Sequence, residues 1–295
     1  MNVMPRPTNL RRAPPIDPRY YQVAVLTSLL VFGIAVLGVD IGPLQPLVVF
    51  SPALGVQYAG TRLARIPRFD PWSPVITGLS LTLLLRADAT WLFAFAAAVA
   101  IGSKFLVRVR DKHVFNPANV GIVAAIGVSD HAWISSGQWG SAAIGAFAFA
   151  CLGFLVLTRA RRAETTLAFL GAWAILVFAR ATWLGDPLAI PVHQLQNVAL
   201  LLFALFMISD PKTSPDSPFG RIVYGTLVAS VAYVIQFVYF TPGAPVLALI
   251  LCAPIVPVID LCFAGRRYEW QSSRPRVATA PAGLFHRSLP KGVKE

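Results

Sequence analysis

Residues 222–259 read IVYGTLVASVAYVIQFVYFTPGAPVLALILCAPIVPVI, without one Asp, Glu, Lys or Arg. A helix needs roughly 20 apolar residues to cross about 30 Å of hydrocarbon. The stretch is long enough for two such helices, and Thr241-Pro242-Gly243 supplies a turn between them. We therefore predict two membrane-spanning helices, 222–240 and 244–263, joined by a tight turn.

The composition of the whole chain supports a membrane protein. Of its 295 residues, 56% are hydrophobic and 13% are charged, and the mean hydropathy is +0.64. A soluble domain carries about 25% charged residues, so these charges are too few to cover a water-soluble globule. The net charge is +12. Because the charges border apolar runs, we expect anionic lipid headgroups as their partner and no nucleic acid.

The apolar runs predict an all-α fold, a polytopic transmembrane bundle of about ten helices. Ten helices also allow two inverted five-helix repeats, an arrangement common in transporters. Three prolines in the last helix predict a break or a kink there. We place the helices at residues 23–39, 46–61, 72–85, 89–106, 117–134, 140–158, 166–183, 194–209, 222–240 and 244–263.

The distribution of basic residues predicts the orientation in the membrane. The two ends of the chain and every second predicted loop carry 23 of the 25 Lys and Arg residues, and only Arg86 and Arg180 fall on the other side. Basic residues favour cytoplasmic loops. We therefore expect a protein of the cell (inner) membrane with both termini in the cytoplasm. Residues 1–19 and 269–295 read as flexible basic segments flanking a transmembrane domain at 20–268.

Two residues near one predicted helix start form a candidate anion site. Asn116 precedes a proline and suits the N-cap position of a helix, which is a purely structural explanation. A helix N-terminus beside Lys104 would also attract an anion such as a flavin phosphate, and Lys104 would offset the negative charge.

Two further candidates lie in other segments. Thr77 belongs to a hydroxyl-rich run that opens the helix at 72–85, where close helix packing is the alternative explanation. Asp210 lies at a predicted membrane edge, where it would hold a cation or a ribityl hydroxyl, or form an Asx turn before Pro211. The cysteines and histidines show no metal-ligand spacing, so we expect no metal site.

Three segments, taken together and in order, resemble the RnfD/NqrB family over roughly residues 20–268. They are SPVITGLSLTLLL at 73–85, Lys104 followed by FNPAN at 115–119, and MISDPKTSP at 207–215 followed by Gly220-Arg221. The resemblance implies a membrane subunit of an Rnf- or NQR-like electron transport system. Such a subunit couples flavin or quinone redox chemistry to ion or solute movement, with other subunits of the complex as partners.

One departure from the family changes the cofactor expectation. The family esterifies FMN to a threonine in a Ser-Gly-Ala-Thr motif, whereas the corresponding residues 197–200 read NVAL here, with Leu200 at the acceptor position. We therefore expect non-covalent flavin, FMN or riboflavin, held by Thr77, Lys104, Asn116 and Asp210, and no covalent FMN. The alternative is a stand-alone transporter or accessory protein on the RnfD scaffold, for example in a natural-product (enediyne-type) pathway, with a small-molecule or ion cargo and no redox cofactor.

Overall fold

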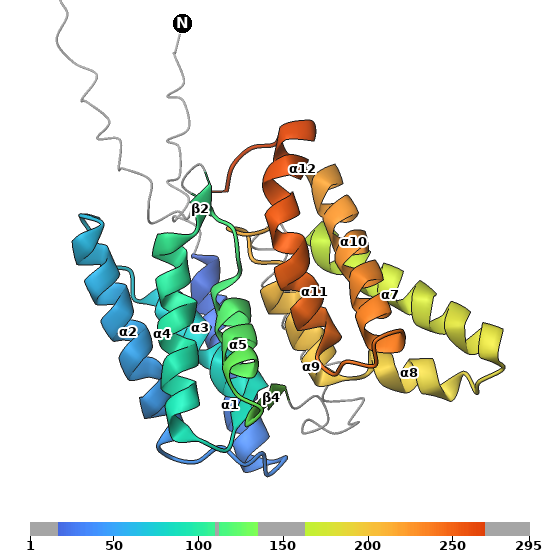
Figure 1. Cartoon of the computed structure of the whole chain (residues 1–295), viewed down its shortest axis with the longest axis horizontal. Coiled ribbons are helices and arrows are strands. Elements are labelled where there is room, and N and C mark those ends of the chain that lie inside the picture. Colours follow the sequence, from blue (N-terminus) through green and yellow to red (C-terminus); the bar gives the residue numbers. More distant parts are fainter. Residues whose placement is uncertain (1–16, 110–111, 135–162, 269–295) are drawn as a thin grey trace, which may run out of the picture.

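The computed structural model describes residues 17–109, 112–134 and 163–268. Two groups of helices lie side by side (Figure 1), and α5 of the first packs against α11 of the second. The first group contains α1 (Pro18–Ala35), α2 (Gln45–Leu63), α3 (Trp72–Leu84), α4 (Thr90–Leu106) and α5 (Pro117–Val128). The second contains α7 (Ala163–Leu184), α8 (Ala189–Leu195), α9 (Val198–Leu202), the π-helix η1 (Phe203–Met207), α10 (Pro218–Phe237), α11 (Ala244–Cys252), the 3-10 turn η2 (Ala253–Ile255) and α12 (Val256–Cys262).

Nine of the ten predicted helices coincide with helical segments of the described residues, which confirms the helical fold class. The remaining one, 140–158, lies outside the described residues. The helix predicted at 194–209 corresponds to α9–η1 at 198–207, but its predicted start is too early, because residues 194 and 195 end α8, which meets α9–η1 at a bend of 47°. Asn197 explains the break, since its side chain caps α9 by accepting a hydrogen bond from the Ala199 amide at 2.8 Å.

Two short antiparallel strand pairs were not predicted. Strand β1 (Leu85–Ala87) pairs with β4 (Ala132–Ile134), and β2 (Arg108–Val109) pairs with β3 (Lys112–His113). The helix predicted at 117–134 is therefore too long: α5 ends at Val128, and Ser129 is already extended. The backbone groups of 132–134 bond to the chain just after α3 instead, a long-range pairing that a local pattern does not reveal.

Several helices are suited to a bilayer. Among the described residues, α7, α10 and the continuous α11–α12 segment are long and apolar enough to cross one, and α8 with α9–η1 forms a fourth span if the bent pair counts as one. Helices α3, α4 and α5 are apolar but shorter. The chain is thus a membrane protein with three to four candidate spans. Ten full spans and the inverted repeat stay predictions.

Close helix contact and prolines shape the second group. A Cβ on Gly225 of α10 would lie 2.6 Å from the Thr165 carbonyl oxygen of α7, so only glycine permits this approach. The last helix was predicted to be broken or kinked at its prolines; a 3-10 turn interrupts it at Pro254, and Pro257 opens α12, while α11–α12 still runs on as one segment. The 3-10 turn accommodates residues that cannot donate to an α-helical ladder.

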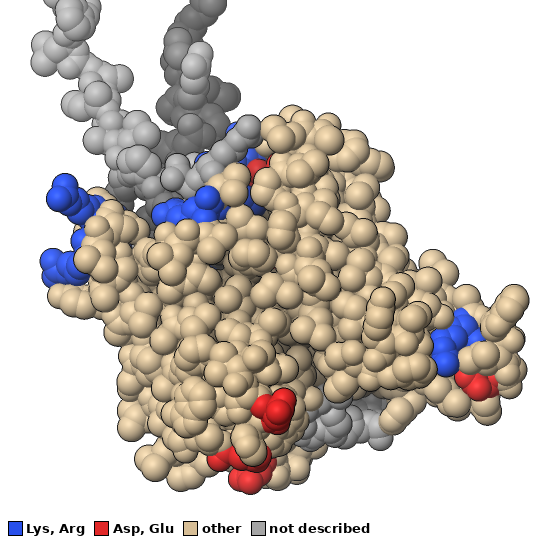
Figure 2. All heavy atoms as spheres, viewed as in Figure 1, with Lys and Arg blue, Asp and Glu red and all other residues tan. Residues whose placement is uncertain are grey.

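Charges gather at the two ends of the molecule. Figure 2 shows most of the visible Lys and Arg at the end where β2 lies and most of the visible acidic residues at the opposite end, with one basic and one acidic patch side by side at the right-hand edge. Arg19 does not lie on this surface. Helix α1 begins at Pro18, and the Arg19 side chain is buried in ion pairs with Asp17 and Asp70. The described fold therefore includes a residue that the sequence placed in the N-terminal arm.

Candidate functional site

A cavity of about 210 Å³ lies between the two helix groups. The first group contributes the N-terminal ends of α1, α3 and α5 and parts of α2 and α4, and the second contributes η1 and the turn after it. All four predicted site residues, Thr77, Lys104, Asn116 and Asp210, line this cavity. We call it the polar cavity.

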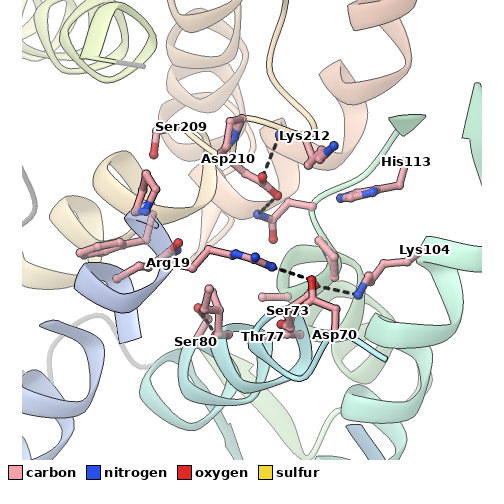
Figure 3. Close-up of a pocket in the computed structure, with 18 of the residues that line it drawn as sticks. Arg19, Asp70, Ser73, Thr77, Ser80, Lys104, His113, Ser209, Asp210 and Lys212 are labelled. Carbon is pink, nitrogen blue, oxygen red and sulfur yellow. Dashed lines mark hydrogen bonds and ion pairs between the residues drawn. The ribbon is translucent and has the colours of Figure 1, made fainter. Parts of the chain in front are cut away.

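Lys104 reaches the polar cavity from the last turn of α4 (Figure 3). Its Nζ donates hydrogen bonds to Gln57 Oε1 at 2.8 Å and to Ser73 Oγ at 2.7 Å. No carboxylate of the described residues lies within 4.0 Å of this nitrogen. The ammonium group is therefore held by neutral oxygens, and its charge can meet that of an anionic ligand.

Asn116 both caps α5 and joins the two helix groups. Its Oδ1 accepts from the Asn119 amide at 3.1 Å, so the predicted N-cap is confirmed. Its Nδ2 donates to the Met207 carbonyl at 3.2 Å and to Asp210 Oδ2 at 3.4 Å. One side chain thus fixes the start of α5 against the turn that follows η1.

Asp210 shapes that turn. Its Oδ1 accepts from the Lys212 amide at 2.9 Å, which confirms the predicted Asx turn. Its Oδ2 accepts a hydrogen bond from Asn116 Nδ2, and Figure 3 shows the Asp210 side chain at the cavity wall. The carboxylate is therefore a structural anchor that also lines the cavity.

Thr77 contributes a hydroxyl to the opposite wall. Its Oγ1 donates to the Ser73 carbonyl at 3.0 Å, one turn back in α3, and Ser80 does the same to Ile76. Each hydroxyl proton is occupied within the helix, which leaves the oxygen lone pairs as acceptors. Both residues line the cavity, so Thr77 can accept a hydrogen bond from a ligand.

The sequence prediction missed three charged residues that line the site, Arg19, Asp70 and Lys212. The Arg19 guanidinium lies across the polar cavity and pairs with Asp70 from the loop before α3 (Figure 3). Asp70 Oδ1 also accepts from the Trp72 amide at 3.1 Å and so steadies the start of α3. The sequence did carry a signal for Asp70: it is the one acidic residue in a predicted loop whose other charged residues are Arg62, Arg65 and Arg68.

His113 lies on β3, between the predicted spans, and also lines the cavity. Burial, together with the nearby cations Lys104, Lys212, Arg108 and Lys112, lowers its pKa to about 3. The imidazole is therefore neutral at physiological pH. The N-terminal ends of α1, α3 and α5 also point at the cavity, and their dipoles carry partial positive charge. These helix ends and the cations near His113 make the cavity suited to an anion.

Leu200 lies in a different cavity, of about 400 Å³, beside α7, α9 and α11. Leu200 is buried and carries no hydroxyl, and none of the described residues that line this cavity is Lys, Arg or His. A phosphate ester would find neither an acceptor oxygen at position 200 nor a counter-charge. The residues present therefore do not fit an esterified FMN at this place.

The sequence of this chain is similar to a known protein family and to several curated proteins. Residues 128–269 match the family model described as the NQR2, RnfD, RnfE family. This stretch, just under half of the chain, is similar to that family. The match includes the Asp210 turn and Leu200, so the NQR2/RnfD/RnfE relationship covers one wall of each cavity.

The similar curated proteins of the NQR2/RnfD/RnfE family share only part of their length with this chain. The D subunit of the ion-translocating oxidoreductase complex of Tolumonas auensis is 34% identical over 36% of this chain and 30% of its own length. The protein of the same name from Mannheimia succiniciproducens is 32% identical over 35% and 27%, and that of Escherichia coli O6:H1 is 29% identical over 52% and 40%. The chain thus matches well under two thirds of these relatives.

Proposed function

We propose that this protein is a membrane subunit of an Rnf/NQR-like electron transport system, coupling flavin or quinone redox chemistry to ion or solute movement. One observation carries the proposal. The three segments that resemble the family, at 73–85, 104–119 and 207–215, are far apart in the sequence and meet at the polar cavity. A shared site explains why these segments occur together in one chain.

The chemistry of the polar cavity favours an anionic ligand. Lys104 offers a buried cation with neutral partners, and the start of α5 at Asn116 offers a helix dipole. Non-covalent FMN is the candidate that the resemblance suggests, with Lys104, Asn116 and Thr77 around its phosphate or ribityl group. A bound flavin would supply the electron-carrying ring. Sites for whole drug-sized ligands measure about 300–1,000 Å³, so a cavity of 210 Å³ suits the anionic end of such a molecule.

Visible absorption of the purified protein, supplied with FMN and then acid-denatured, tests this proposal. We expect flavin that is released on denaturation, and at least tenfold weaker FMN binding in Lys104→Met, because a charge-assisted contact contributes about 1.5–3 kcal/mol. Arg68→Met is the matched control, since Arg68 is exposed and should bind FMN like the unmodified chain. A folded, colourless protein that binds no FMN would contradict the redox function.

Asp210→Ala tests the anchor of the same site. Loss of the Asx turn and of the Asn116 contact should impair FMN binding while the protein still inserts into the membrane. FMN affinity and membrane-fraction yield are the two measurements. Normal affinity in a well-inserted variant would remove Asp210 from the proposed site.

A second candidate function is a stand-alone transporter or accessory protein without a redox cofactor. Leu200 favours it, because the hydroxyl that would carry FMN is missing. Cargo uptake or efflux by colourless protein in vesicles would support this candidate. Flavin retained through purification would support the electron-transport function instead.

We also propose that the basic end of the molecule faces the cytoplasm, since basic residues favour that side. Cys262 is exposed at the end of α12, close to Arg266 and Arg267, and reports on this end. In a variant with Cys151→Ser and Cys252→Ala, an impermeant maleimide should label inverted vesicles and spare intact cells. The reverse labelling pattern would overturn the orientation.

A further inference from the structure

The segment that ends α2 repeats one pattern three times. Residues 62–69 read RLARIPRF, in which an apolar side chain directly follows each Arg. All eight residues are exposed, and Leu63 is 85% exposed. A surface that alternates guanidinium groups with apolar side chains suits a boundary between water and hydrocarbon. We call residues 62–69 the basic-apolar segment.

The backbone holds this segment in a defined turn. The Arg65 amide donates to the Arg62 carbonyl at 3.1 Å, and the Ile66 amide donates to the Thr61 carbonyl at 3.0 Å, which is the Schellman motif that ends many helices. Arg65 occupies the left-handed position of the motif, with φ of 52°. Glycine is the usual residue there, because a side chain is strained at positive φ. An arginine at such a position points to a use for its charge.

The charges of the segment are not neutralised by the part of the chain that the structure describes. No carboxylate of that part lies within 4.0 Å of Arg62, Arg65 or Arg68. Asp70, the next acid along the chain, pairs with Arg19 instead. The segment therefore offers three positive charges to an anionic partner.

The segment lies at the basic end of the molecule. A Cβ on Gly60 would lie 2.5 Å from the Phe105 ring, so the last turn of α2 packs against the last turn of α4. Strand β2 follows α4 directly, and most of the visible Lys and Arg lie at that end (Figure 2). Leu106, the last residue of α4, is 84% exposed and extends the apolar part of this surface.

Aromatic side chains beside the segment are of the kind found where a bilayer meets water. Tyr58 packs edge to face on Phe69 with ring centroids 6.3 Å apart, and the Arg62 guanidinium lies over the Tyr58 ring at 5.1 Å. Trp72, at the start of α3, packs in the same manner on Tyr20 of α1. Tyr and Trp are enriched at both membrane–water interfaces. This setting favours lipid over a soluble acidic protein as the partner.

We propose that the basic-apolar segment anchors this end of the protein in the bilayer by binding anionic phospholipid. The guanidinium groups bind lipid phosphate, to which the planar fork of Arg is matched, and Leu63, Ile66 and Phe69 enter the outer acyl region. The proposal is independent of the redox function, because none of residues 62–69 lines the polar cavity.

Native mass spectrometry of the delipidated full chain, titrated with dioleoyl phosphatidylglycerol or dioleoyl phosphatidylcholine, tests the proposal. The two lipids share their acyl chains, but the first is anionic and the second zwitterionic. One Arg near an anionic bilayer surface contributes roughly fivefold, so we expect phosphatidylglycerol to bind roughly tenfold more tightly or better.

Two matched triple variants separate the segment from net charge. Replacement of Arg62, Arg65 and Arg68 by Gln should abolish most of the preference for phosphatidylglycerol. Replacement of Arg274, Arg276 and Arg287 by Gln removes the same charge from the C-terminal tail and should leave the preference intact. An equal loss in both variants would overturn the proposal, and so would equal binding of the two lipids by the unmodified chain.

Two further variants separate lipid binding from folding. Arg65→Gly relieves the strain and removes the charge, so it should raise the melting temperature in detergent by about 1–3 °C while it weakens phosphatidylglycerol roughly fivefold. A higher melting temperature with unchanged lipid affinity would mean a merely solvated arginine. Leu63→Ser combined with Phe69→Ser should weaken both lipids roughly threefold or more. Unchanged binding in that variant, as a docking site for an acidic soluble protein would give, contradicts the anchor.

Discussion

The ion-pair cluster around Lys112 offers the sharpest test of how the two helix groups are held together. Lys112, on β3 of the first group, donates to Asp260 Oδ2 at 3.1 Å, to Asp216 Oδ1 at 3.2 Å and to the Ser214 carbonyl at 2.7 Å, all in the second group. The three charged side chains are 14–17% exposed. Lys112→Met would leave two neighbouring carboxylates without their counter-charge.

The size of the effect follows from this burial. Removal of one partner from a fully buried ion pair costs about 3–5 kcal/mol, and the partial exposure here reduces that to about 2–4 kcal/mol. For a chain of this length each kcal/mol shifts the melting temperature by roughly 2–4 °C, so we expect a decrease of about 4–16 °C.

Thermal unfolding in detergent, followed by far-ultraviolet circular dichroism, measures the decrease. Arg68→Met removes an exposed cation and should stay within about 0.5 kcal/mol of the unmodified protein. Asp260→Asn completes a double-mutant cycle, whose coupling energy should reach about 1–3 kcal/mol. A Lys112→Met protein that melts within 2 °C of the unmodified chain, on the order of 1 kcal/mol, would refute the reasoning.

Three further predictions concern stability. Asn116→Leu should cost about 1–3 kcal/mol in unfolding experiments, because it removes the cap and the bridge to Met207, whereas Asn116→Asp should retain the cap. Native His113 stays neutral down to a pKa of about 3 while unfolded histidine titrates near 6.5, so stability should fall by about 1.4 kcal/mol per pH unit below 6.5 and not change above it. His113→Gln should remove this slope, and His131→Gln, at an exposed position, should keep it. Gly225→Ala should destabilise by about 1–3 kcal/mol through overpacking against α7, whereas Gly171→Ala, with open space around it, should not destabilise; similar melting temperatures for the two would contradict the close contact.

Local sequence patterns determine much of this fold. Long apolar runs locate the helices, and short signals such as Asn116 before Pro117 fix a helix start to the residue. Pro254 and Pro257 likewise mark the 3-10 turn, because proline has no backbone N–H to donate to the α-helical hydrogen bonds. These features depend on residues that are neighbours in the chain, so the sequence alone predicts them.

Other features depend on partners far along the chain. From the sequence alone Arg19 belongs to a basic arm, but in the structure it pairs with Asp70. Residues 132–134 were predicted as the end of a helix, but they form β4, which pairs with β1. The candidate residues Thr77, Lys104, Asn116 and Asp210 could each be explained locally as packing, capping or turn residues. Only the tertiary structure brings them to one cavity, and it also adds Arg19, Asp70 and His113.

The segment from Leu200 to Asp210 forms a wall of two cavities. Leu200 and Phe203 line the cavity of about 400 Å³ beside α7, α9 and α11, and Leu205, Phe206 and Asp210 line the polar cavity. Within it, the π-helical turn η1 holds one more residue per turn than an α-helix would. The extra residue of that turn is absorbed within it, but adding or deleting one residue in the α-helical turn before it, Val198–Leu202, would rotate everything beyond by about 100° around the helix axis. Point substitutions can therefore diversify either cavity separately, but changes in length between 198 and 202 would disrupt both at once, so we expect evolution to preserve the length of this segment more strictly than its side chains.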